Sequence, residues 1–171
     1  SKKIMDLLKS YGFPMQQNSI DEAALDLKNK SYDEAKEIGK EIKERIAREM
    51  ALPSTVGISF GPVFAKMVCD AAKPDGLLAV DEAHISEFLQ DKSIEKIPGI
   101  GPRAKEKLEG MGIKTIGELA KANAQKLIEV LGSFGDELHL LANGIDKSKV
   151  VQESEILSIS REKTLDNATG E

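Results

Sequence analysis

Along the first half of the chain, apolar residues recur at helical spacing in some segments and form short runs in others. Between residues 32 and 50 they lie three or four positions apart, with Glu and Lys between them, which is typical of a helix with one solvated face. The full pattern predicts helices over 2–11, 32–50, 63–72 and from 81 or 82 to 89, and strands over 13–18, 23–28, 55–60 and 77–80. Asp81 is the predicted N-cap of the fourth helix. The run at 55–60 is almost continuously apolar, so we expect this strand inside a sheet.

The pattern of apolar and polar residues changes in the second half of the chain. From about residue 93 to 145 the pattern predicts only short amphipathic helices separated by glycines, without a strand. We therefore predict an α+β fold, in which residues 1–92 form a small mixed or antiparallel sheet with packed helices and residues 93–145 form an all-α unit. Residues 146–171 contain one strand-like run without a visible partner, which is predicted to be a linker or an edge strand.

Composition narrows the class of protein. An apolar content of 40% and a charged content of 31% describe a globular protein, and no stretch approaches the ~20 apolar residues of a membrane span. Cys69, the single cysteine, is interpreted as a core residue, and the predicted location is the cytoplasm. The net charge of −5 argues against a dedicated nucleic-acid binder, because such proteins usually carry a basic face. The chain starts at Ser1 within a predicted helix, which suggests a piece of a longer protein.

Two adjacent acids, Asp21 and Glu22, lie between the first two predicted strands. Neighbouring carboxylates repel each other, whereas a divalent cation that bridges phosphate oxygens needs such a pair. Neighbouring side chains of a regular strand point to opposite faces, so these two can share a cation only at a bulge or where a strand leaves a turn. The alternative is a solvated hairpin tip, with Asp26 as a further exposed acid.

Two lysines bear on this choice. Lys66 lies in the predicted helix 63–72 and Lys73 in the turn that follows it, where either ammonium can reach a polyphosphate as a mobile point charge. The alternative is an ordinary solvated helix end, which the dipole at the helix C-terminus favours for Lys73.

The most specific pattern of the second half spans residues 97–108. An apolar residue is followed by Gly99-Ile-Gly101 and by a helix that opens with Arg103 and Lys105, which is the signature of a helix-hairpin-helix. The glycines let the backbone approach a phosphate, and N–H groups at the helix start point toward it, so binding is sequence-independent and salt-sensitive. The alternative is a helical turn whose glycines only permit close packing. A weaker echo at residues 131–135 is predicted to serve the core.

Taken together, these segments resemble the Y-family DNA polymerases, the translesion enzymes of the DNA polymerase IV type. Residues 19–26 look like the palm motif Ser-Ile-Asp-Glu-Ala-Tyr-Leu-Asp, and residues 56–76 hold pieces of the second palm motif. Residues 97–101 and 112–119 look like the thumb, and residues 158–164 look like the start of the little-finger domain. The pieces stand in family order over nearly the whole chain.

The resemblance implies a role for each matching residue. Asp21 matches a ligand of the catalytic metal, Glu22 matches the acid beside it that helps to activate the primer 3′-hydroxyl, and Lys73 matches a lysine that contacts the triphosphate. Two Mg²⁺ ions are implied in the full-length protein, with primer–template DNA and a dNTP as partners. A sliding clamp is a further implied partner, contacted through a C-terminal region beyond this chain. The implied DNA contacts of the thumb are Gly99, Gly101, Arg103 and Lys105.

The resemblance also assigns the parts of the chain. Residues 1–92 become a partial palm domain, 93–145 the helix-hairpin-helix thumb, and 146–171 the linker and start of the little finger. The family's first metal-binding Asp and the fingers have no match in this sequence, so the chain alone is expected not to polymerise. Ala24 stands where the family usually has Tyr, and residues 60–63 (Phe-Gly-Pro-Val) replace a polar turn of the Asn-Lys type.

Three hypotheses follow from these patterns. The leading one is a palm-and-thumb fragment of a translesion DNA-directed DNA polymerase. The second is a non-catalytic DNA-binding paralogue that grips duplex through the helix-hairpin-helix thumb, which the acidic balance and the Gly61-Pro62 turn favour. The third is a protein-interaction module with a solvated acidic tip.

Overall fold

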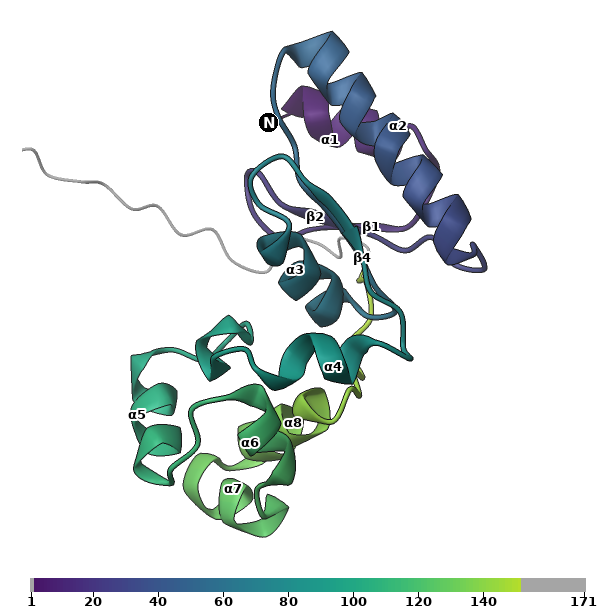
Figure 1. Ribbon diagram of the computed structural model, residues 1–171. Helices are drawn as coiled ribbons and strands as arrows, with labels where there is room; N and C mark the ends of the chain where they lie inside the picture. The colour runs from purple at the N-terminus through teal and green to yellow at the C-terminus, as the bar shows by residue number, and fades with distance from the viewer. Residues whose placement is uncertain (1, 152–171) are drawn as a thin grey trace, which may run out of the picture.

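The computed structural model describes residues 2–151 (Figure 1). Its first part contains the elements α1 (Lys2–Lys9), β1 (Met15–Gln17), β2 (Ala23–Leu25), α2 (Tyr32–Met50), β3 (Val56–Ile58), α3 (Pro62–Ala71) and β4 (Leu77–Ala79). Its second part contains α4 (Ile85–Gln90), a 3₁₀ turn η1 (Ile94–Lys96), α5 (Pro102–Gly110), α6 (Ile116–Lys121), α7 (Ala124–Leu131) and α8 (Ser133–Ala142). The predicted α+β fold class is confirmed, and helix 32–50 has the predicted ends. The predicted little-finger residues 158–164 lie outside the described residues.

The strands of the first part form two separate pairs. β1 and β2 are antiparallel, with Met15 opposite Leu25, and β3 and β4 are parallel, with Val56 opposite Leu77. Within residues 2–151, β3 pairs only with β4, so the prediction that this strand lies inside a sheet is wrong for the described part of the chain. Its apolar character has another cause, because helices cover both of its faces.

Two glycines allow this close cover of β3. A Cβ on Gly39 of α2 would lie 3.2 Å from the Val56 side chain, and a Cβ on Gly57 would lie 2.2 Å from the Cys69 backbone nitrogen of α3. α2 therefore packs on one side of the β3–β4 pair and α3 packs against β3 at a distance that only glycine permits. Cys69 is only half-buried and belongs to neither buried cluster of the described residues, so the interpretation as a core residue is not confirmed.

The first part has its own small core where α1, β1 and α2 meet. Figure 1 shows α1 and α2 side by side at the end of the molecule away from the last helices. Among residues 2–151 this cluster consists of Met5, Leu7, Leu8, Met15, Ile42 and Ile46. Helix α2 is fixed at its start by a capping box, in which the Ser31 hydroxyl accepts from the Glu34 N–H and the Glu34 carboxylate accepts from the Ser31 N–H.

A larger core joins α3 and β4 to the helices of the second part. Its buried members in the first part are Phe64, Met67, Val68 and Val80, and they continue into eleven buried side chains between Ile85 and Ala142 within the described residues. α4 lies directly below α3 in Figure 1 and connects the two parts. The boundary near residues 91–93 stays a prediction, and it falls between two elements that share this core.

The start of α4 differs from the prediction. The helix begins at Ile85 with His84 as its N-cap residue, so the prediction of Asp81 as N-cap is wrong. The Asp81 carboxylate instead closes a turn over residues 81–84, accepting from the His84 N–H at 3.1 Å. Of the helices between residues 2 and 151, none has the length and apolar character needed to cross a membrane.

Candidate functional site

The acid pair lies in the turn that joins β1 to β2. The Glu22 carbonyl accepts from the Asn18 and Ser19 N–H groups at 2.9 and 3.2 Å, which closes the loop just before β2 begins. Asp21 is exposed at this tip, and its carboxylate accepts from the Ser19 hydroxyl at 2.6 Å. That hydrogen bond, aided by the positive charges of Lys73 and Lys66, lowers the pKa of Asp21 below its ordinary value. The pair therefore lies where a strand leaves a turn, at the tip of a hairpin, a position that suits both a shared cation and a solvated acidic tip.

The two acids differ in their partners. The Glu22 carboxylate is hydrogen-bonded to the Lys66 ammonium of α3, and the Lys73 ammonium lies 4.0 Å from it. Asp70 completes the group, since its carboxylate is 2.7 Å from the Lys73 ammonium and 3.2 Å from that of Lys66. The structure thus places both predicted lysines beside the acid pair, and it adds Asp70, which the sequence reasoning missed.

The sequence did contain a signal for Asp70. Lys66, Asp70 and Lys73 have the spacing i, i+4 and i+7, which places three charged side chains on one helical face. The same spacing occurs on many solvated faces, including that of α2, where Lys40 pairs with Glu37. Only the contact with Glu22, 44 positions earlier in the chain, distinguishes this face.

The electrostatics of this group favour the charged forms of Lys66, Asp70 and Lys73. Burial opposes the charge of Lys66, but hydrogen bonds to Glu22 and Asp70 outweigh it and raise the pKa of Lys66. Burial likewise opposes the charge of Asp70, and the hydrogen bonds from Lys73 and Lys66 together lower the pKa of this carboxyl. The hydrogen bond to Asp70 raises the pKa of Lys73. The arrangement is a network of alternating charges, half-exposed on the surface.

A divalent metal ion needs more ligands than this group offers. Carboxylate oxygens suit a hard cation such as Mg²⁺, and Asp21 and Glu22 supply two of them. Residues 2–151 nevertheless contain no group of three or more His, Cys, Asp or Glu side chains that could hold a metal ion. One of the two acids is also engaged by Lys66. The described residues alone therefore do not fit a metal site.

The glycines of the helix-hairpin-helix lie open at the start of α5. Gly99 has φ +94°, a conformation that favours glycine, and Gly101 is the extended N-cap residue of the helix. A Cβ on Gly101 would meet nothing within 4 Å, and one on Gly99 would make only ordinary contact with Phe134 at 3.6 Å. The alternative that these two glycines serve close packing is therefore wrong.

The two glycines of the echo differ from each other, because a Cβ on Gly132 would meet nothing within 4 Å whereas Gly135 is crowded. A Cβ on Gly135 would lie 2.2 Å from the Leu127 carbonyl oxygen, so this glycine lets α8 pack on α7. The prediction that the echo serves the core is confirmed at this position.

The basic residues of α5 are only partly available to a ligand. Arg103 is exposed in the first turn, beside the open glycines. The Lys105 ammonium pairs with Glu95, and Lys107 donates to the Val130 carbonyl at the end of α7 at 2.9 Å. Within residues 2–151, Arg103 and the N–H groups at the helix start therefore form the part of this surface that is open to a ligand.

The unusual Gly61-Pro62 turn has a structural partner from the far end of the described chain. The Asp146 carboxylate accepts from the Val63 N–H at 2.9 Å, which caps the start of α3 across 83 positions. A Cβ on Gly61 would lie 2.3 Å from this carboxylate oxygen, so glycine is needed for the contact. The segment after α8 is thereby fastened to the first part of the molecule.

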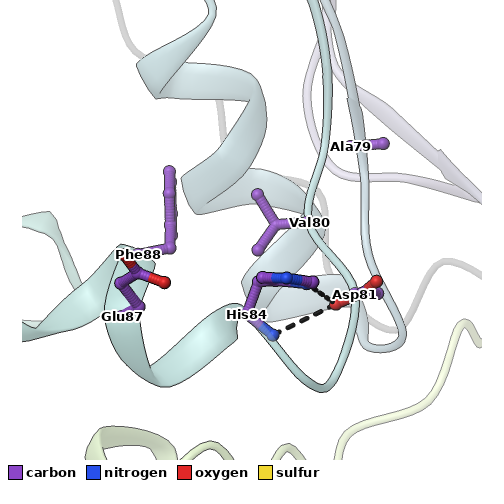
Figure 2. A pocket seen from close by; sticks show the side chains of 6 residues that line it. All are labelled: Ala79, Val80, Asp81, His84, Glu87 and Phe88. Atoms are coloured by element: carbon purple, nitrogen blue, oxygen red, sulfur yellow. Dashed lines mark hydrogen bonds and ion pairs between the residues drawn. The ribbon is translucent and has the colours of Figure 1, made fainter.

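A second concave surface lies at the junction with α4 and is shown in Figure 2. Its lining residues are Ala79, Val80, Asp81, His84, Glu87 and Phe88. Asp81 lies 2.5 Å from the His84 ring and raises the pKa of this imidazole through the hydrogen bond. None of these side chains belongs to the group around Glu22, so the pocket is separate from the candidate site.

Comparison with known sequences gives two family matches. Residues 1–70 match the sequence model of the impB/mucB/samB family, and residues 95–146 match that of the DNA polymerase-iota thumb domain. A DNA polymerase IV of Halobacterium salinarum is 37% identical over 170 residues, which cover 99% of this chain and 41% of the relative. A DNA polymerase IV of Methanoculleus marisnigri is 38% identical over 172 residues, covering 100% of this chain and 48% of the relative. The chain thus spans less than half the length of these relatives.

Solved structures agree with these matches. A Y-family DNA polymerase chimera of Dbh and Dpo4 superposes with a TM-score of 0.83 at 30% identity, covering 91% of this chain and 46% of that chain. DinB from Sulfolobus solfataricus gives a TM-score of 0.78 at 29% identity, covering 87% and 45%. These matches place the chain in the class of DNA polymerases, with the fold of a palm followed by a thumb. Within that class, the chain belongs to the Y family.

Proposed function

We propose that the chain forms the palm and thumb of a longer translesion DNA polymerase, which adds dNTPs to a primer on template DNA. One observation carries the proposal: the motif acids Asp21 and Glu22 lie beside Lys66 and Lys73, in a chain that is 37% identical to a DNA polymerase IV over 99% of its length. Acids that can hold a cation, next to ammonium groups that can meet phosphates, suit phosphoryl transfer.

Each site residue has a proposed role. Asp21 and Glu22 are ligands for the divalent metal on which such a polymerase depends, and Mg²⁺ is the ion proposed, with further ligands from outside the described residues. Bound Mg²⁺ supplies charge stabilisation for the transferring phosphoryl group. Lys73, exposed just after α3, is proposed to bind the triphosphate, and Glu22 is proposed to help activate the primer 3′-hydroxyl.

The thumb is proposed to hold the DNA backbone. Gly99 and Gly101 leave the start of α5 open, and the free Arg103 beside them adds a positive charge. Lys105 can join them when a phosphate competes with Glu95 for its ammonium. The proposed partners are therefore primer–template DNA and a dNTP, which agrees with a solved relative described as an insertion ternary complex of Dbh DNA polymerase. The sliding clamp and the cytoplasmic location stay predictions from the sequence.

Primer extension by the full-length protein tests the proposal. With labelled primer–template, dNTPs and Mg²⁺, we expect extension that falls at least about a hundredfold in Asp21→Asn and in Glu22→Gln. Asp26→Asn is the matched control, because this exposed acid follows the same hairpin and its carboxylate accepts only from the Lys28 N–H among described residues. Undiminished extension by the Asp21 and Glu22 variants contradicts the proposal.

The non-catalytic paralogue is the second candidate, because Lys66 already neutralises Glu22 in this structure. It predicts duplex binding without extension. Both candidates expect Arg103→Ala to weaken binding and to reduce the slope of log affinity against log salt by about 1, whereas the remote Lys40→Ala has no effect. The absence of extension by the wild-type protein decides for the paralogue.

A further inference from the structure

Asp70 contacts both lysines of the candidate site. Its carboxylate lies 2.7 Å from the Lys73 ammonium and 3.2 Å from the Lys66 ammonium. Lys66 in turn is the counter-ion of Glu22, which the Lys73 ammonium approaches only to 4.0 Å. The four side chains come from two segments, the hairpin that carries Glu22 and the face of α3 and its following turn that carries the other three.

The order of charges in this group has a physical consequence. Two ammonium groups that share one acidic partner repel each other, and Lys66 acts on Lys73 in this sense. Asp70 contacts both ammonium groups and so reduces this repulsion. Lys66 can then pair with Glu22, while the Lys73 side chain stays 52% exposed to solvent. Lys66 is the more buried of the two, with a side chain that is 31% exposed.

We propose that Asp70 is a positioning residue, which assigns Lys66 to Glu22 and holds Lys73 ready for the phosphates of the incoming nucleotide. This inference rests on the function proposed above and concerns the same site. Without the Asp70 charge, Glu22 is the one remaining ion-pair partner of Lys73 among residues 2–151, so Lys73 turns toward that acid and away from the nucleotide. Asp70 thereby acts through Lys73 and does not touch the nucleotide itself.

Nucleotide kinetics of the full-length protein test the inference. In single-nucleotide extension, Asp70→Asn is expected to raise KM for the dNTP about tenfold while kcat changes less than about threefold, because charged hydrogen bonds of this kind are worth a factor of that size. Asp70→Glu keeps the charge and is expected to restore most of the affinity. Equilibrium binding of dATP, measured calorimetrically, is expected to weaken by the same factor in Asp70→Asn.

A double-mutant cycle identifies the route of the effect. Lys73→Met is expected to raise KM like Asp70→Asn, and the double variant is expected to add nothing further, since Asp70 acts through Lys73. Asp75→Asn is the matched control: this acid lies two positions after Lys73, but it pairs with Lys43 at 2.6 Å. Its KM is expected to stay at the wild-type value.

The outcomes separate this inference from the proposed function. A wild-type protein that extends primers while Asp70→Asn leaves KM unchanged overturns the role of Asp70 alone, as does full additivity of Asp70→Asn and Lys73→Met. A wild-type protein that binds dATP without extending a primer overturns the polymerase function, and the dATP affinities of the variants then decide on Asp70. A wild-type protein that neither extends nor binds dATP overturns both.

Discussion

The palm part and the thumb part of this chain use their side chains in opposite ways. Where α1, β1 and α2 meet, only six side chains of the described residues form a buried cluster. The thumb and the elements packed against it share a core of fifteen buried side chains among the described residues. Charged side chains show the reverse contrast: the palm joins four of them, Glu22, Lys66, Asp70 and Lys73, in one network. Lys105 and Lys107 of the thumb are instead used within the thumb itself.

This difference teaches where the two parts draw their stability and their chemistry. A helical unit with a continuous apolar core is held by burial, and it can leave a few backbone groups open at Gly99 and Gly101. The palm has two two-stranded ladders and a thinner core, and its distinctive contacts are electrostatic. Candidate chemistry thus lies in the less buried region, with the larger core as its support.

The largest expected effect concerns these two cores. Leu127→Ala removes a side chain that is 0% exposed in the larger core, and we expect the free energy of unfolding to fall by about 3–4 kcal/mol. Met5→Ala acts in the small cluster, where a flexible side chain is 5% exposed, and is expected to cost about 2 kcal/mol. Urea unfolding followed by circular dichroism measures both.

The neighbouring Ile128→Ala serves as control for the core comparison. This side chain is 37% exposed, so we expect a loss below about 1 kcal/mol. The comparison of the two cores fails if Met5→Ala proves as costly as Leu127→Ala.

The next effect sharpens the difference between the two kinds of glycine in the thumb. Gly135→Ala places a methyl group 2.2 Å from the Leu127 carbonyl oxygen, and we expect a loss of about 1–3 kcal/mol in the free energy of unfolding. Gly110→Ala, at the end of α5, meets nothing within 4 Å and is expected to stabilise the chain by about 0.5 kcal/mol. Thermal unfolding of the two variants separates them, and a stabilising Gly135→Ala speaks against the proposed packing of α8 on α7.

The two regions also differ in how far the sequence predicts them. Helical periodicity and the glycines that end helices are signals within a few residues of sequence. Such local signals predict α2 and the helices after residue 93. The open turn at Gly99 follows from local rules as well, because its positive φ is a property of the turn itself, while its role in DNA binding stays a prediction. Asp81 shows the limit of such rules, since a carboxylate before a helix can close a turn as well as cap the helix.

The charged contacts of the palm could not be predicted in this way. Lys66 reaches Glu22 across 44 positions, and Asp146 reaches Val63 across 83. Local spacing in the sequence cannot predict contacts between residues so far apart in the chain, because they depend on how the elements pack together. Asp21, Glu22 and Lys73 were singled out through their motifs, while Asp70 was given no role from the sequence and became visible only through its contacts.

A smaller effect tests the contact that joins the two regions. Asp146→Ala removes the cap of α3 and is expected to lower the free energy of unfolding by about 1 kcal/mol, whereas Asp146→Asn keeps an acceptor and loses less. Gly61→Ala is expected to resemble Asp146→Ala, because its methyl group occupies the place of the carboxylate. Thermal unfolding and amide hydrogen exchange at Val63 measure the change.

The exposed Glu137→Ala on α8 is the control for this contact, with little effect expected. If hydrogen exchange at Val63 is the same in Asp146→Ala and the wild type, the cap contributes nothing to the junction.

The smallest effect compares two capping boxes, one in each region. Glu34 of α2 accepts from Lys30, which lowers its pKa from 4.5 to about 2, with the Ser31 hydrogen bonds as further causes. Glu118 of α6 has a lowered pKa mainly because it accepts from the Lys114 and Thr115 N–H groups. A carboxyl with a lowered folded-state pKa binds fewer protons than the unfolded chain, so its contribution is fully present above about pH 4.5 and disappears as the pH falls toward 2.

The melting temperature should report this difference. We expect Glu34→Gln to lower it at pH 7 and to have no effect near pH 2. Because an exposed ion pair is screened by salt while a backbone hydrogen bond is not, 1 M NaCl should shrink the effect of Glu34→Gln more than that of Glu118→Gln. If the two variants respond equally to salt, the ion pair between Glu34 and Lys30 contributes nothing measurable. Both helices would then be capped by hydrogen bonds alone.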